Sequence, residues 1–176
     1  AVIEIILNSN EPRGAIAHDR YWNVVMANAA FVRFLTLILG SAPANLFPMQ
    51  LATPPHVNLL HLLFDPNSLR RVILNWEACA KALLNEAYRR LAWARDDMLK
   101  ELIADILKYP GVPARWREPE LEGPQALILP MEMNLNGKIA RMFSTVTTVD
   151  NAVFGDIGAS LPLLADDAHI VIVGAV

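Results

Sequence analysis

Apolar residues recur along residues 67–93 at the spacing of one helix face, and this pattern predicts a long amphipathic helix. Its apolar stripe comprises Val72, Ile73, Trp76, Cys79, Ala80, Leu83, Leu84, Ala87 and Leu91. A second helix is expected over residues 96–108, because the pattern ends at Pro110-Gly111. The preceding segment "NLLHLLF" predicts a shorter helix, with Asn58 as a candidate cap.

The residues before these helices predict smaller elements. Residues 1–9 are apolar and compatible with a helix, which Pro12-Arg13-Gly14 ends. The segment "AIAHDRYWNVVMA" predicts two short strands around Asp19-Arg20. Asn28 then suits the N-cap of a helix over "AAFVRFLTLIL", which stops at Gly40. Residues 40–57 are rich in proline and are expected to form a loop.

A β-hairpin is predicted for "LILPMEMNLNGKIARMFSTVTT", residues 127–148. Asn136-Gly137 joins its strands, because a type I′ turn needs positive φ at both central positions. The resulting register places Glu132 opposite Arg141 on one face. It gathers three methionines on the other face, namely Met131, Met133 and Met142. A third strand is expected within residues 152–163. The order of elements favours an α+β fold, with one antiparallel sheet and helices stacked on one face.

Composition narrows the range of functions. The chain of 176 residues fits one domain, and 54% of it is hydrophobic while 19% is charged. This apolar excess requires a large core, a partner surface or an apolar cavity. No apolar run approaches the ~18 residues of a membrane span. The net charge of −3 gives no electrostatic reason to bind nucleic acid. A single cysteine excludes an internal disulfide and fits a reducing cytoplasm.

The sequence carries no recognisable catalytic motif. His18, His56, His61 and His169 form no metal-binding pattern, and no glycine-rich phosphate loop or nucleophile elbow is present. Cys79 lies on the apolar helix stripe, which favours an inert core thiol over a nucleophile. We therefore expect neither an enzyme nor a metal or cofactor site.

Four segments occur in an order that resembles a known family: "AIAHDRYWNVVMANAA", "VNLLHLLFDPNSLRRVILNWEACAKALL", "YPGVPARW" and "ARMFSTVTTVDNA". Together they resemble the MmyB-like ligand-binding domain of bacterial XRE-type helix-turn-helix transcription regulators. The resemblance extends from about residue 12 to residue 169. It implies a PAS-like fold, a five-stranded antiparallel sheet with helices covering one face. It also implies a sensor that binds a small apolar ligand, with fatty acids as expected ligands.

The resemblance also suggests a domain organisation. Residues 1–11 would be an N-terminal helical segment or linker, and residues 12–176 the PAS-like ligand-binding domain. DNA would be bound only through a helix-turn-helix domain that this sequence does not contain. The segment "HIVIVGAV" reads as a strand, whereas the resemblance implies a helical ending.

In a PAS-like domain the ligand pocket lies between the sheet and the helices. Methionine suits such a pocket, because it is unbranched and repacks around varied guests. The residues expected to line the pocket are Phe34, Leu60, Phe64, Ile73, Trp76, Ala80, Leu129, Met131, Met133 and Met142. An ordinary methionine-containing core remains the alternative.

Three polar residues are candidates for contacts with the ligand headgroup. Asn75 would either bond the headgroup or cap a neighbouring loop. The long side chain of Arg71 would reach a carboxylate at the pocket mouth. The hydroxyl of Ser144 would bond the headgroup or the hydroxyl of Thr148. Trp22 and Asn28 match the family pattern, and we interpret them as a packing residue and a helix cap.

Other functions compete with ligand sensing. The apolar excess, including Ile139 and Phe143, would also serve an interaction module that forms a homodimer or docks the DNA-binding domain. A flavin or haem sensor is a third hypothesis, although the sequence offers no convincing axial ligand.

Overall fold

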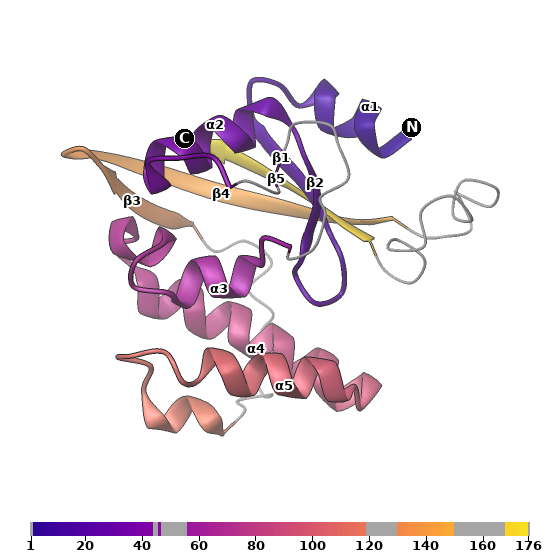
Figure 1. Cartoon of the computed structure of the whole chain (residues 1–176), viewed down its shortest axis with the longest axis vertical. Helices are drawn as coiled ribbons and strands as arrows, with labels where there is room; N and C mark the ends of the chain where they lie inside the picture. The colour runs from indigo at the N-terminus through magenta and orange to yellow at the C-terminus, as the bar shows by residue number, and fades with distance from the viewer. Residues whose placement is uncertain (1, 44–45, 47–55, 119–129, 150–167, 176) are drawn as a thin grey trace. The chain divides into compact units, whose positions relative to one another are not determined.

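The structure, a computed structural model, describes residues 2–43, 46, 56–118, 130–149 and 168–175 (Figure 1). The chain divides into two units by its internal packing. The first comprises Ala1–Leu59 and Met142–Val176, and the second comprises Leu60–Arg141. Each is considered by itself below.

The first unit is built around strand β1. Its elements are helix α1 (Val2–Ser9), strands β1 (Gly14–His18) and β2 (Val24–Ala27), helix α2 (Ala29–Leu39), most of strand β4 (Lys138–Val149), and strand β5 (Ala168–Ala175). Strand β1 pairs antiparallel with β2 on one side and with β5 on the other, and β5 pairs antiparallel with β4. Because β1 has a neighbouring strand on each side, its side chains are buried and its sequence is mostly apolar. Ala15, Ile16 and Ala17 are all buried.

Two helices pack against β1. Both α1 and α2 contact this strand, and Figure 1 shows them beside it. A Cβ atom added to Gly14 would lie 3.5 Å from Phe31, so helix and strand are in close contact there. The predicted helix-compatible start, the two short strands and the helix ending at Gly40 are all confirmed.

The second unit is mainly helical. It contains α3 (Leu59–Phe64), the short 3-10 helix η1 (Leu69–Val72), α4 (Trp76–Ala94), α5 (Asp97–Ile106), the 3-10 helix η2 (Ala114–Arg117) and strand β3 (Met131–Leu135). Helices α4 and α5 pack together. The carboxylate of Asp96 caps α5 by accepting hydrogen bonds from the amides of Met98 and Leu99.

The prediction of one helix over residues 67–93 is wrong at its start. The chain forms η1, then an extended residue at Ile73 and a turn over residues 74–75, and α4 begins only at Trp76. The amide of Leu74 donates to the carbonyl of Glu132 at 2.7 Å, and Ile73 forms a β-bridge with Met133. These bonds to β3 replace the intrahelical bonds, so Val72 and Ile73 leave the predicted stripe. From Trp76 onward the prediction holds, since Cys79, Ala80, Leu84 and Ala87 are buried.

The predicted hairpin is confirmed. Asn136 and Gly137 have φ values of 53° and 84°, as a type I′ turn requires. The amide of Gly137 also donates to the side-chain oxygen of Asn134 at 2.8 Å. Glu132 and Arg141 form the predicted ion pair at 3.1 Å. Within the first unit the order of the strands is β2-β1-β5-β4.

The C-terminal prediction has a mixed outcome. Residues 152–163, where a strand was expected, lie outside the described residues. The segment "HIVIVGAV" supplies β5, so its strand pattern is confirmed and the helical ending implied by the resemblance is wrong. The α+β class is confirmed, while the PAS-like arrangement of sheet and helices stays a prediction. Within the described part of the chain, no helix has the length and apolar character that a membrane span requires.

Candidate functional site

Three buried aromatic side chains form a cluster in the second unit. They are Phe64 at the end of α3, Trp76 at the start of α4 and Trp116 in η2. The Phe64 and Trp76 ring centroids lie 5.9 Å apart and edge to face, and those of Trp76 and Trp116 lie 5.6 Å apart. The indole nitrogen of Trp76 donates to the carbonyl of Leu63 at 2.7 Å. This bond fixes the ring's orientation, because an indole N–H has a single donor direction.

The guanidinium of Arg70 covers one face of this cluster. Its central carbon lies 3.5 Å from the centroid of the Trp76 ring, a cation–π contact. Its Nη1 donates to the carbonyls of Pro110 at 2.6 Å and of Phe64 at 3.2 Å. Burial lowers the pKa of Arg70, and the nearby charge of Glu77 opposes that shift.

Gly111 allows Arg70 to take this position. Its φ of +74° belongs to the left-handed region, which favours glycine. A Cβ atom there would also lie 2.7 Å from Nη2 of Arg70, closer than real Cβ contacts. A side chain at residue 111 would therefore displace the guanidinium.

Strand β3 is attached to the residues just before α4. The side-chain oxygen of Asn75 accepts from the amide of Glu132 at 2.9 Å, and its nitrogen donates to the carbonyl of Pro130 at 2.8 Å. Together with the Ile73–Met133 bridge, these bonds involve three predicted positions, Ile73, Asn75 and Met133. Asn75 thus holds a neighbouring segment, one of the two roles expected of it. Ile73 and Met133 are buried.

The remaining predicted positions are distributed between the two units. In the second unit Leu60 and Ala80 are buried, Met131 is half-buried and Arg71 is exposed. Phe34 on α2, together with Met142 and Ser144 on β4, belongs to the first unit, and all three are half-buried. Leu129 lies outside the described residues. Ligand contacts of all these residues stay predictions.

Arg70 and Trp116 were not selected from the sequence. Arg70 precedes Trp76 by six positions, a spacing that places two residues on different faces of a helix, and only the break before α4 brings them together. Trp116 belongs to the segment "YPGVPARW", where a lone tryptophan among prolines was the available signal. Its carbonyl accepts from the hydroxyl of Tyr88 at 3.0 Å, which ties η2 to α4.

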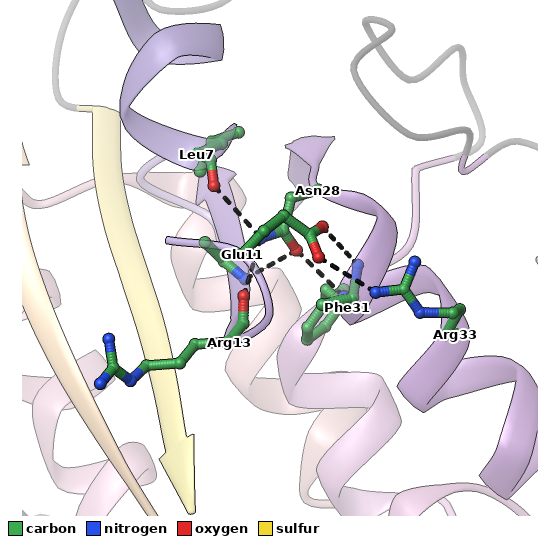
Figure 2. Close-up of polar contacts among 8 residues, drawn as sticks. Leu7, Glu11, Arg13, Asn28, Phe31 and Arg33 are labelled. Atoms are coloured by element: carbon green, nitrogen blue, oxygen red, sulfur yellow. Dashed lines mark hydrogen bonds and ion pairs between the residues drawn. The ribbon is translucent and has the colours of Figure 1, made fainter. Parts of the chain in front are cut away.

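Asn28 joins four segments of the first unit (Figure 2). Its side-chain oxygen accepts from the amides of Phe31 and Ala15, each at 3.0 Å. Its side-chain nitrogen donates to the carbonyls of Arg13 at 2.8 Å and of Leu7 at 3.2 Å. The side chain is fully buried and uses both its donors and its acceptor. The predicted helix cap is confirmed, and Asn28 also connects α1 and β1 to the start of α2.

Glu11 supports the same helix start. One carboxylate oxygen accepts from the amide of Ala30 at 2.8 Å, and the other pairs with Arg33 at 3.0 Å (Figure 2). A carboxylate at this position stabilises the helix, because it interacts favourably with the positive end of the helix dipole.

Cys79 has the properties of a core thiol. It is buried on α4, and burial raises the pKa of its thiol to about 11. The thiol therefore stays protonated at neutral pH, which supports the interpretation as an inert thiol. Among the residues that the structure describes, no group of three or more metal-type ligands could hold an ion.

A comparison with models of protein families shows which family the chain belongs to. Residues 2–154 match the model of the MmyB-like transcription regulator ligand binding domain. The chain belongs to this family. The predicted resemblance is therefore confirmed, and the family is one of regulatory ligand-binding domains rather than enzymes. A comparison with curated proteins finds no match.

Within this MmyB-like ligand-binding domain, the aromatic cluster is the candidate functional site. It combines buried apolar side chains with the guanidinium of Arg70, and small-molecule sites usually combine apolar residues with a few polar groups. The cluster and the adjacent β3 contain several of the predicted ligand contacts, namely Phe64, Ile73, Asn75, Trp76 and Met133.

Proposed function

We propose that this chain is the sensory domain of a bacterial transcription regulator and that its ligand is a small apolar molecule such as a fatty acid. The family match over residues 2–154 carries the proposal. In this proposal the sheet and helices form a PAS-like domain. DNA is bound by an XRE-type helix-turn-helix domain attached to it, and the regulator works in the cytoplasm.

The apolar residues around β3 support an apolar ligand. Met131 is half-buried, Met133 two residues later is fully buried, and Met133 bridges to Ile73, three positions before Trp76. Methionine adapts to guests of different shape, and each methylene of a bound acyl chain would contribute about 0.8 kcal/mol. We therefore propose that Met131 contacts the acyl chain.

Organic extraction of the purified protein, followed by mass spectrometry, tests the proposal. We expect a fatty acid in near-stoichiometric amount. The variant Met131→Trp should lose most of it, because the larger ring occupies the ligand's place. Ile139→Trp is the matched control on the same hairpin, since Ile139 is 68% exposed and should tolerate the change.

A protein that yields no lipid and binds no added fatty acid would overturn the proposal. Calorimetric titration with saturated acids of ten to eighteen carbons tests this, because eight additional buried methylenes would contribute about 6 kcal/mol.

A second candidate is an interaction module without ligand. Two large apolar side chains favour it, Trp93 with 91% of its surface exposed and Ile139 on the hairpin. Light scattering over a range of concentrations tests it. A homodimer that Ile139→Glu dissociates would support this function, whereas a strict monomer at high concentration would exclude the dimer.

A further inference from the structure

We propose that Arg70 binds the acidic headgroup of the ligand, so that the domain selects carboxylate-bearing apolar molecules over neutral ones. The inference rests on the proposed function, because it names the ligand class of the same site. It assigns the headgroup to a residue that sequence reasoning did not select.

Arg70 has a free donor edge. Both of its hydrogen bonds to carbonyls use Nη1, and no described residue accepts from Nε or Nη2. These two nitrogens form one side of the guanidinium plane, and their parallel N–H groups match the two oxygens of a carboxylate. Within the described chain Arg70 also forms no ion pair, so its charge lacks a counter-ion in contact.

The free edge is held in a fixed orientation. The Trp76 ring supports one face of the guanidinium, and the carbonyls of Phe64 and Pro110 hold Nη1. Gly111 approaches Nη2 closely, where any other residue would place a Cβ atom 2.7 Å from it. A cation fixed in this way loses little conformational entropy when it binds an anion.

Unsatisfied polar atoms in the same region point to a ligand independently. The indole nitrogen of Trp116 is buried without a hydrogen-bond partner among the described residues, and only 3% of the surface of Trp116 is exposed. In the same part of the chain, the hydroxyl of Ser68, two residues before Arg70, is also buried without a described partner. Buried donors normally find acceptors, and the oxygens of a bound ligand would provide them.

Arg71, the residue predicted to reach a carboxylate, lies in a different environment. Its side chain is exposed, so water competes for it, whereas Arg70 is partly buried. Burial lowers the pKa of Arg70, and a bound carboxylate would offset the cost of keeping that charge. Arg71 is therefore the matched control for Arg70.

The test compares decanoic acid with 1-decanol, which have the same chain length but different headgroups. Both are titrated into the delipidated chain, with tryptophan fluorescence as the signal. We expect the wild type to bind the acid about tenfold or more tighter than the alcohol, as for a hydrogen bond to a charged group. Arg70→Gln should lose this preference, measured as the ratio of the affinities for acid and alcohol, and Arg71→Gln should keep the ratio of the wild type.

The outcomes separate the two proposals. If Arg70→Gln binds the acid as tightly as the wild type does, or if the wild type shows no preference, the headgroup assignment is overturned and apolar binding stands. If the wild type binds neither probe, the proposed function fails with it. Should Arg70→Gln fail to fold by circular dichroism, Arg70→Lys keeps the charge without the planar fork, and a reduced acid preference in that variant supports the assignment. An undiminished preference in Arg70→Lys would overturn bidentate recognition.

Discussion

The side-chain oxygen of Asn75 accepts a hydrogen bond from the backbone amide of Glu132 at 2.9 Å, although the two residues are 57 positions apart. The same side chain donates to the carbonyl of Pro130, and the amide of Leu74 donates to the carbonyl of Glu132. One carboxamide at the start of α4 thus fixes the beginning of β3. A residue at this position commonly caps its own helix, but Asn75 makes no such bond.

Replacing Asn75 by alanine should destabilise the domain by about 1–3 kcal/mol, because the amide of Glu132 loses its acceptor. Urea denaturation followed by circular dichroism measures the change in the free energy of unfolding. Asn67→Ala is the control, since Asn67 is exposed and its side chain has no described contact. Equal stability of the two variants would show that the bonds of Asn75 contribute nothing net.

Asn28→Ala should be more damaging. The change removes the cap of α2 and leaves buried groups of α1, β1 and α2 without partners, so we expect a loss on the order of 3 kcal/mol. Thermal unfolding should show a single, lower transition. The exposed Asn8 offers a matched Asn→Ala control on α1. A variant as stable as the wild type would contradict the role of Asn28 as the connection between these segments.

Gly111→Ala and Gly40→Ala form an informative pair. Both glycines have positive φ, and so both substitutions should cost about 1 kcal/mol of backbone strain. A Cβ atom at residue 40 meets open space, whereas one at residue 111 meets Nη2 of Arg70. Gly111→Ala should therefore be the less stable variant in urea denaturation. Indistinguishable midpoints would mean that the guanidinium moves aside at no cost.

The buried thiol of Cys79 should make stability depend on pH in the alkaline range. The folded protein keeps the thiol proton up to a pKa of about 11, whereas the ordinary value is 9.0. The unfolded chain therefore binds fewer protons between these values, and the free energy of unfolding should fall as the pH rises from 9 to 11. Burial also raises the pKa of Tyr88 and Tyr109, so Cys79→Ala should reduce the slope rather than abolish it.

The same thiol should resist alkylation. At pH 8 its thiolate fraction in the folded state should be about 100-fold smaller than in the unfolded chain, and iodoacetamide should react correspondingly slowly. The rate with and without urea, followed by mass spectrometry, measures this difference. Rapid modification of the native protein would show that Cys79 is accessible and ionised.

The elements that the sequence predicted correctly are those that depend on residues close together in the chain. The cap at Asn28, the stop at Gly40 and the Asn136-Gly137 turn depend on side-chain and backbone chemistry within a few residues, and the structure shows each of them. The Glu132–Arg141 pair followed from the register that this turn sets. The family resemblance rested on quoted segments, and the family match confirms it.

Features that depend on distant residues were not predictable. The stripe through Val72 and Ile73 fits a helix locally, but hydrogen bonds with β3 replace the first turn. The same long-range bonds direct Asn75 away from its own helix. The position of Arg70 over Trp76 requires the break before α4 and the turn at Gly111, and neither follows from the spacing of residues 70 and 76.

The pairing of β1 with β5 has a consequence for synthesis on the ribosome. Gly14 lies opposite Val173, so the internal strand of the first unit has one neighbour that is translated almost a full chain length later. Until then β1 has only β2 beside it, and its other edge is open to pairing with foreign strands. Formation of this pair closes a loop that contains all of residues 60–141, and such non-local pairing slows folding. The first unit should therefore complete its sheet only after β5 has been translated, while the helices of the second unit, built from neighbouring residues, can form earlier during translation.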